Sequence, residues 1–169
     1  GAGLGVATGD MGLQRDGTPG PNFERGVELH GKYVLIGEGA RGSLAKSLIA
    51  NFNLDEHSNP QKFGLGFKEL WEIDPEKHSE GTVMHTLGWP LQNNQDGGSF
   101  IYHIEINHVY VCYVVALGYN NPYLSPFDEF QRFKTHTSVA PLLEGGKRIS
   151  YGARAITQGG WQSVPRLSF

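Results

Sequence analysis

The middle and the end of the chain alternate apolar and polar positions with the period of two that is typical of β-strands. The apolar runs are rich in β-branched and aromatic residues, and clusters of Gly, Pro, Asn and Asp separate them. Because short polar connections join neighbouring runs, the pattern predicts an antiparallel sheet of four or five strands. The predicted strands cover 63–73, 83–89, 99–104 and 109–117, and the tail predicts further strands at 148–155 and 162–169.

One segment behind this sheet has helical periodicity. Ser125 directly precedes Pro126, a pair typical of an N-cap followed by the first helical residue. Three aromatic side chains then recur every three residues and share one face: Phe127, Phe130 and Phe133. We expect this face to pack on the sheet. The alternative is contact with a membrane surface, with Arg132 and Lys134 near lipid phosphates.

The front of the chain has a different pattern. Short apolar runs and turns over 1–39 predict a three-stranded antiparallel meander, and the run at 32–36 predicts a buried strand. A glycine-rich turn at 37–42 follows, and then a helix over 43–53 with Ser43 as its N-cap. This order brings backbone amides close to a nucleotide in α/β proteins. The spacing matches no named phosphate fingerprint, so the nucleotide is left open.

Composition and charge exclude several classes of protein. The chain has 169 residues, a net charge of −3 and a pI near 6.2, so we expect no nucleic-acid partner. The 24 glycines form no repeat. Cys112 is the only cysteine and lies in an apolar run, which predicts a small buried side chain rather than a reactive thiol.

Seven runs, taken together and in order, are similar to one family, the electron transfer flavoprotein–ubiquinone oxidoreductases. Any one of the runs is weakly specific, whereas the combination is highly specific and covers nearly the whole chain. The runs lie at 5–12, 37–46, 68–71, 85–91, 97–103, 121–127 and 143–149.

The resemblance implies an FAD and iron–sulfur oxidoreductase at a membrane surface. Such an enzyme takes electrons from reduced electron transfer flavoprotein and passes them through a [4Fe-4S] cluster and FAD to ubiquinone. The resemblance implies a location at the matrix face of the mitochondrial inner membrane or at a bacterial cytoplasmic membrane. On this template, residues 1–57 are part of a glutathione-reductase-like FAD domain. Residues 58–169 form a mostly antiparallel ubiquinone-binding domain with helices that returns to the FAD domain near its end.

The resemblance also implies that the chain is an internal segment of a longer protein. The family's N-terminal glycine fingerprint for the ADP part of FAD has no counterpart here, nor has its later glycine motif. A single cysteine cannot hold a four-iron cluster, so we expect the cluster ligands elsewhere. We therefore expect FAD to be completed by other regions, no metal ligand or catalytic side chain in this segment, and no enzymatic activity of the segment alone.

The resemblance places the quinone site at Gly97 and Gly98. A flat, uncharged quinone ring needs a close approach to the backbone, which glycine allows. Four side chains nearby in the sequence complete the predicted site: Trp89, Phe100, Tyr102 and His103. The residues alone favour plainer alternatives, namely a hairpin turn at Asp96–Gly97, ordinary strand packing for the aromatic rings, and a structural role for the histidine.

The glycine turn carries the predicted cofactor contacts. By the resemblance it lies beside the FAD dinucleotide, where Gly37 and Gly39 allow close packing. Glu38 and Arg41 flank these glycines, and Arg41 either offsets phosphate charge or forms a surface ion pair.

Two other functions are alternatives. The first is a geranylgeranyl-reductase-like or hydroxylase-like FAD enzyme, which shares the strand, glycine turn and following sheet. The runs at 97–100 and 121–126 argue against it. The second is a truncated fragment without catalytic activity.

Overall fold

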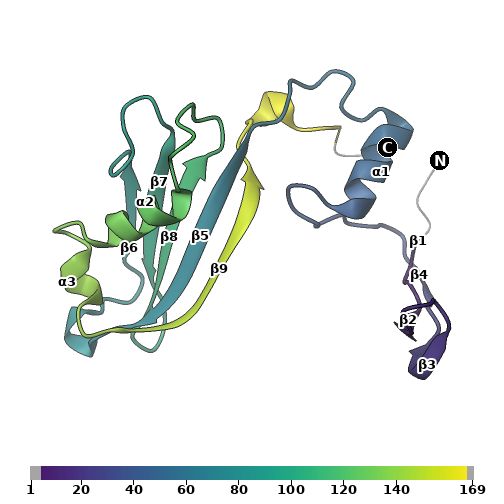
Figure 1. Ribbon diagram of the computed structural model, residues 1–169, viewed down its shortest axis with the longest axis horizontal. Helices are drawn as coiled ribbons and strands as arrows, with labels where there is room; N and C mark the ends of the chain where they lie inside the picture. Colours follow the sequence, from purple (N-terminus) through teal and green to yellow (C-terminus); the bar gives the residue numbers. More distant parts are fainter. Residues whose placement is uncertain (1–4, 167–169) are drawn as a thin grey trace. The chain divides into compact units, whose positions relative to one another are not determined.

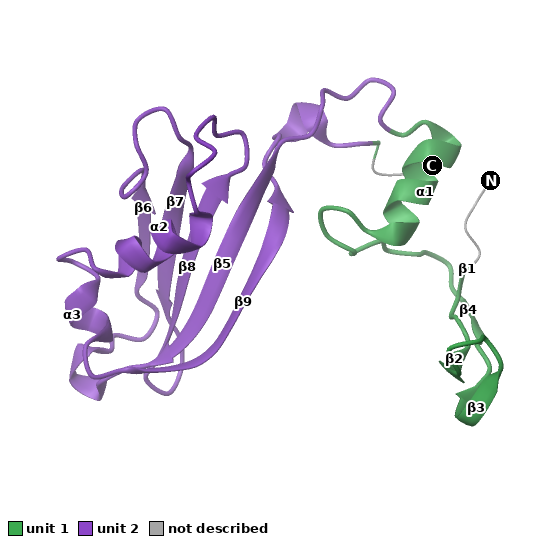
Figure 2. Ribbon diagram, viewed as in Figure 1, with its two compact units in different colours: residues 1–54, 166–169 green, residues 55–165 purple. Residues whose placement is uncertain are grey.

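The computed structural model describes residues 5–166 and divides the chain into two compact units. Unit 1 comprises residues 1–54 and 166–169, and unit 2 comprises residues 55–165 (Figure 2). The division falls between Leu54 and Asp55, a few residues before the boundary predicted at 57.

Unit 2 is built on a five-stranded antiparallel sheet (Figure 1). The order across the sheet is β6 (Val83–Leu87), β7 (Gly97–His103), β8 (His108–Ala116), β5 (Phe63–Glu72) and β9 (Lys147–Thr157). Every neighbouring pair is antiparallel, as the alternating pattern predicts. A 3₁₀ turn, η1 (Pro75–Lys77), follows β5, and the short helix α3 (Ala140–Leu143) precedes β9. The mostly antiparallel architecture with few helices is thus confirmed for this unit.

Helix α2 (Pro126–Lys134) covers one face of the sheet. Its N-cap is Ser125, whose hydroxyl accepts a hydrogen bond from Asp128 N at 3.3 Å, as predicted. Phe130 and Phe133 are 1% and 2% exposed, and both rings stack on Tyr113 of β8. These two rings lie in the core rather than at the surface, so the membrane alternative does not hold for them. Only Phe127 is half exposed.

The core of unit 2 lies between α2, α3 and this face of the sheet. Because side chains alternate along a strand, every second residue of β8 points into the core. The core cluster comprises Ile73, Leu91, Ile101, Val109, Val111, Tyr113, Val115, Phe130, Phe133, Val139 and Leu143.

Unit 1 contains two separate ribbons instead of the predicted three-stranded meander. Strand β1 (Gly5–Ala7) pairs with β4 (Glu28–His30), and β2 (Met11–Leu13) pairs with β3 (Pro19–Glu24). The predicted strand at 32–36 is wrong for the structure as described, because no described strand lies beside this segment to form a ladder with it. Its apolar side chains are accordingly uncovered, and Leu35 is 93% exposed.

The structure corrects two further predictions, the N-cap of the helix at 43–53 and the strand at 162–169. Helix α1 (Ser43–Phe52) forms as predicted, but its N-cap is Gly42 rather than Ser43. The strand predicted at 162–169 is replaced by a 3₁₀ turn, η2 (Trp161–Ser163), because the positive φ of Gly160 (73°) turns the chain. Residues 167–169 of that prediction lie outside the described part of the chain.

Candidate functional site

Gly97 and Gly98 are the first two residues of strand β7, which lies between β6 and β8 in the sheet. Gly97 pairs with Val115 of β8, and Gly98 lies between Val114 of β8 and Leu87 of β6. A Cβ atom on Gly97 would collide with the Leu91 side chain and the Val114 carbonyl, and one on Gly98 with the Thr86 carbonyl. The pair therefore belongs to a strand rather than to a hairpin turn, and the backbone packing itself requires glycine.

The loop from Gly88 to Asp96 closes over the start of β7. Gly88 N donates to Gly97 O at 3.1 Å, and Leu91 N donates to Gly88 O at 2.9 Å. In a regular ladder, Gly97 N would return a bond to Gly88 O. Within residues 5–166 Gly97 N–H has no acceptor, because Gly88 has a positive φ of 79° and leaves the ladder geometry. The site thus contains a backbone donor that the protein does not use.

Trp89 follows Gly88 in this loop and precedes Pro90 in a cis peptide bond. Its side chain is 44% exposed, and its ring centroid lies 4.9 Å from that of His136, just beyond α2. No local sequence pattern points to His136, because it lies far from Trp89 along the chain and only the fold brings the two rings together.

Phe100 and Tyr102 lie on the opposite face of β7 from the core. They alternate with the buried Ile101, and their ring centroids are 4.6 Å apart. His85 of β6 joins them, 6.2 Å from Phe100 and 5.8 Å from Tyr102. Cys112 of β8 lies on this face too and is buried, as predicted. Burial raises the pKa of its thiol to about 11, so the reactive thiolate is disfavoured.

His103 lies at the far end of β7. It lies six positions after Gly97 along the extended strand, which corresponds to about 20 Å. Its Nδ1 accepts a hydrogen bond from Ser79 N at 3.1 Å, and the ring of His78 lies 5.2 Å away. Burial, followed by the charge of His78, lowers the pKa of His103.

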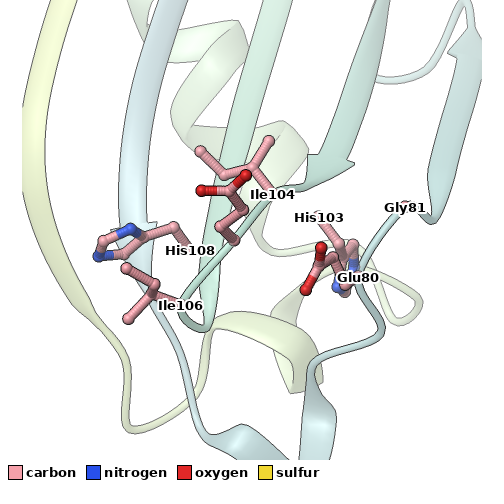
Figure 3. Close-up of a pocket in the computed structure, with 7 residues that line it drawn as sticks. Glu80, Gly81, His103, Ile104, Ile106 and His108 are labelled. Carbon is pink, nitrogen blue, oxygen red and sulfur yellow. The ribbon is translucent and has the colours of Figure 1, made fainter.

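A separate pocket surrounds His103 at the turn between β7 and β8. The pocket has a volume of about 390 Å³, and Glu80, Ile106 and His108 line it with His103 (Figure 3). The structure therefore does not bring His103 together with Gly97 and Gly98, although all three belong to one strand.

The predicted cofactor contacts lie before helix α1. The Glu38 carboxylate accepts hydrogen bonds from Leu44 N at 3.3 Å and Ala45 N at 2.7 Å. It therefore caps the helix and takes the place that a phosphate would have at a helix N-terminus. Gly37 and Gly39 face open space, since a Cβ atom on either would meet nothing within 4 Å. Arg41 is exposed and has no ion pair among the residues that the structure describes.

No helix among the described residues is long and apolar enough to cross a membrane. Residues 63–156, which include all five strands of the large sheet to within one residue, match the family model described as "ETF-QO, ubiquinone-binding".

Curated relatives match almost the whole chain. It is 52% identical over 166 residues to the electron transfer flavoprotein-ubiquinone oxidoreductase of Pseudomonas aeruginosa, covering 98% of this chain and 30% of that protein. It is 54% identical to the mitochondrial protein of that name from Dictyostelium discoideum, covering 100% of this chain and 28% of the relative. For the human mitochondrial protein the identity is 53%, with coverages of 98% and 27%. The chain thus spans less than a third of each relative, and it belongs to the electron transfer flavoprotein–ubiquinone oxidoreductase family, of which it contains the ubiquinone-binding domain.

Proposed function

We propose that these residues form the quinone-binding part of an oxidoreductase that transfers electrons from reduced electron transfer flavoprotein to ubiquinone. The observation that carries the proposal is the unused Gly97 N–H, in the segment that matches the ubiquinone-binding model and is bonded to the loop that carries the partly exposed Trp89. The names of the human and Pseudomonas aeruginosa relatives support a mitochondrial or a bacterial location, and a membrane surface there is part of the proposal.

The proposed headgroup site uses a backbone donor and an aromatic ring. A quinone carbonyl oxygen accepts hydrogen bonds, and Gly97 N–H supplies one without a side chain to screen it. The indole of Trp89 offers an apolar surface to the flat ring. Gly98 lets β6 and β7 approach each other at this point, because a side chain there would strike the Thr86 carbonyl.

The proposal does not assign the headgroup to the other predicted quinone contacts, Phe100, Tyr102 and His103. Phe100 and Tyr102 form, with His85, an aromatic wall on the face of the sheet away from α2. His103 lies too far along β7 to reach a ring bound at Gly97. It instead holds the segment around Ser79 against the end of the sheet.

The residues of the glycine turn fit one edge of FAD. Gly37 and Gly39 are open to a flat neighbour, and Arg41 is a cation without an ion pair in the described part of the chain, which a phosphate would attract. Glu38 does not fit a phosphate at the α1 N-terminus, because its carboxylate already accepts the amides there. FAD would supply the electrons when bound. The single buried Cys112 does not fit a four-iron cluster, whose ligands would be thiolates from elsewhere.

The proposal is tested by Gly97→Ala in the full-length protein that contains these residues. The new Cβ displaces Leu91 and the Val114 carbonyl, so the donor moves away from the ring. We expect the KM for a short-chain ubiquinone to rise at least about tenfold, since a misplaced site loses more than one hydrogen bond. Reduction of the flavin by electron transfer flavoprotein should stay unchanged.

Gly118→Ala is the matched control, because a Cβ atom there meets nothing within 4 Å. Melting temperature and flavin content should show that the Gly97 variant is folded. A folded Gly97→Ala protein with normal quinone kinetics would overturn the proposal.

A second measurement addresses the chain by itself. We expect the purified 169-residue chain to bind no stoichiometric flavin, because the contacts at 37–41 are only one edge of a site. Its absorption spectrum, compared with that of the full-length protein, decides the point. A flavin band of equal intensity in both samples would contradict this expectation.

A further inference from the structure

His136 is held rigidly between α2 and α3, at the side of the proposed quinone site. Its backbone N–H donates to Phe133 O at 3.1 Å, and its carbonyl accepts from Val139 N at 2.9 Å and Ala140 N at 2.8 Å. Its ring packs against Trp89 at 4.9 Å with an interplanar angle of 59°. The imidazole therefore has a fixed position beside the loop that carries the headgroup site.

The hydrogen bonds of His136 also fix its tautomer. Ser138 N lies 3.1 Å from Nδ1. A backbone N–H can only donate, so Nδ1 must be the unprotonated, accepting nitrogen. In the neutral ring the proton is then on Nε2, which becomes a donor.

This Nε2–H has no acceptor among residues 5–166. His136 as a residue is only partly buried. Trp89 links the two unused donors, Gly97 N–H and His136 Nε2–H, because its ring packs on His136 and its backbone directly follows Gly88, whose N–H is bonded to Gly97 O.

We infer that His136 donates a hydrogen bond through Nε2–H to a carbonyl oxygen of the bound quinone ring, an inference that rests on the proposed function. The donor binds and orients the quinone, and it stabilises the negative charge that builds up on that oxygen when the ring accepts an electron. The acceptance of the Ser138 amide by Nδ1 leaves Nε2–H as the donor of the ring. His136 contributes a hydrogen bond and does not transfer its proton.

The test compares three substitutions in the full-length protein. His136→Phe keeps a ring against Trp89 but removes the donor, and His136→Gln keeps an N–H donor. His57→Phe is the control, because His57 is exposed and lies outside both α2 and the loop. The probe is ubiquinone-1, and the readouts are its KM and kcat, the rate of flavin reduction by electron transfer flavoprotein, and the melting temperature.

We expect His136→Phe to raise the KM for ubiquinone-1 by about three- to tenfold, the effect of one lost hydrogen bond. His136→Gln should stay within about threefold of the unchanged protein. Flavin reduction and the His57 variant should be unaffected. This pattern separates a substrate hydrogen bond from a packing role, because packing against Trp89 is best preserved by phenylalanine.

Two outcomes would overturn the inference, and they point to different causes. If His136→Phe has a normal KM while Gly97→Ala raises it, the quinone binds as proposed and His136 does not contact it. If neither substitution changes the KM in folded protein, the proposed quinone site itself is wrong. A KM raised equally by Phe and Gln, together with a lower melting temperature, would assign His136 to packing and would also reject the inference.

Discussion

The two units of the chain differ in how they bury their apolar residues. Unit 2 contains a cluster of eleven buried residues between its sheet and helices. In the described part of unit 1, Leu54 is the one buried large hydrophobic residue, and no residue of α1 is buried. Both units have regular elements, so the difference lies in whether those elements have neighbours to pack on.

The difference in burial is clearest between two apolar runs that have similar sequence patterns, one in β8 and one at 32–36. The run in β8 is covered because β5 and β7 pair with it on both sides and α2 packs on one face. The run at 32–36 has no paired neighbour in the described chain, and Tyr33 and Leu35 are 88% and 93% exposed. Stability of this chain should therefore reside in unit 2.

The largest expected effect tests this difference directly. Phe130→Ala should lower the free energy of unfolding by about 3–5 kcal/mol, because it removes a ring from the centre of the core. Leu35→Ala should change it by less than about 0.5 kcal/mol, because the side chain is already in solvent. Urea unfolding followed by circular dichroism measures both. Equal effects of the two substitutions would refute the contrast between the units.

A buried charge cluster is the second feature found in unit 2 alone among the described residues. Glu69, 2% exposed, accepts hydrogen bonds from Lys134 Nζ at 2.9 Å, Arg148 Nη1 at 3.0 Å and Trp71 Nε1 at 2.8 Å. Glu69→Gln should cost about 3 kcal/mol, because it leaves the buried ammonium of Lys134 without its counter-charge. Glu129→Gln is the matched control. Its partner, Arg132, is exposed, so the loss should be below about 1 kcal/mol.

The same cluster makes the stability of unit 2 depend on pH. Burial raises the pKa of Glu69, but the bonds from Lys134, Trp71 and Arg148 outweigh it and hold the pKa below the ordinary value. Its stabilisation is therefore present above the pKa of the unfolded chain and is lost as the pH falls through the folded value. The unchanged protein should lose stability in this acid range, and Glu69→Gln should show a flatter profile. Parallel profiles would contradict the assignment.

Sequence patterns predicted unit 2 better than unit 1 for a physical reason. Its strands carry a clear alternating pattern, β6, β7 and β8 pair in chain order, and Ser125 with Pro126 is a local cap, so these elements follow from local signals. The pairing of β5 with the distant β8 and β9 has no such local signal. The run at 32–36 has the composition of a buried strand, but composition does not show whether another strand pairs with it. In the site, the approach of His136 to Trp89 could not be predicted, because only the path of α2 across the sheet creates it.

The start of α1 shows the same limit of sequence patterns on a smaller scale. Serine is a residue type typical of an N-cap, yet it is the carboxylate of Glu38, upstream of Ser43, that accepts the amides of the first helical turn. The glycines on either side of Glu38 give the chain the freedom to fold back, and Gly39 has a φ of 81°. A cap contributed from outside the helix start has no fixed spacing that a sequence pattern could detect.

Glu38→Ala tests how much the Glu38 carboxylate stabilises the first turn of α1 in unit 1. The substitution removes two acceptor bonds from the first turn of α1, so local opening there should become easier by about 1 kcal/mol. Amide hydrogen exchange at Leu44 and Ala45 should accelerate about fivefold. Glu56→Ala, an exposed carboxylate beyond the helix, is the control. Unchanged exchange at Ala45 would show that the carboxylate does not cap the helix.

The smallest expected effect lies at the far end of β7 and is a pH dependence. Burial, with the charge of His78 second, lowers the pKa of His103, so the folded protein prefers the neutral ring whose Nδ1 accepts from Ser79 N. The stabilisation is present above the unfolded pKa of histidine, about 6.5, and is lost as the pH falls through the lower folded value. The melting temperature should therefore decline slightly more below neutral pH in the unchanged protein than in His103→Gln. His57→Gln should follow the unchanged protein, because His57 is exposed. If the quinone KM also moved in His103→Gln, the separation of His103 from the Gly97 site along the strand would be wrong.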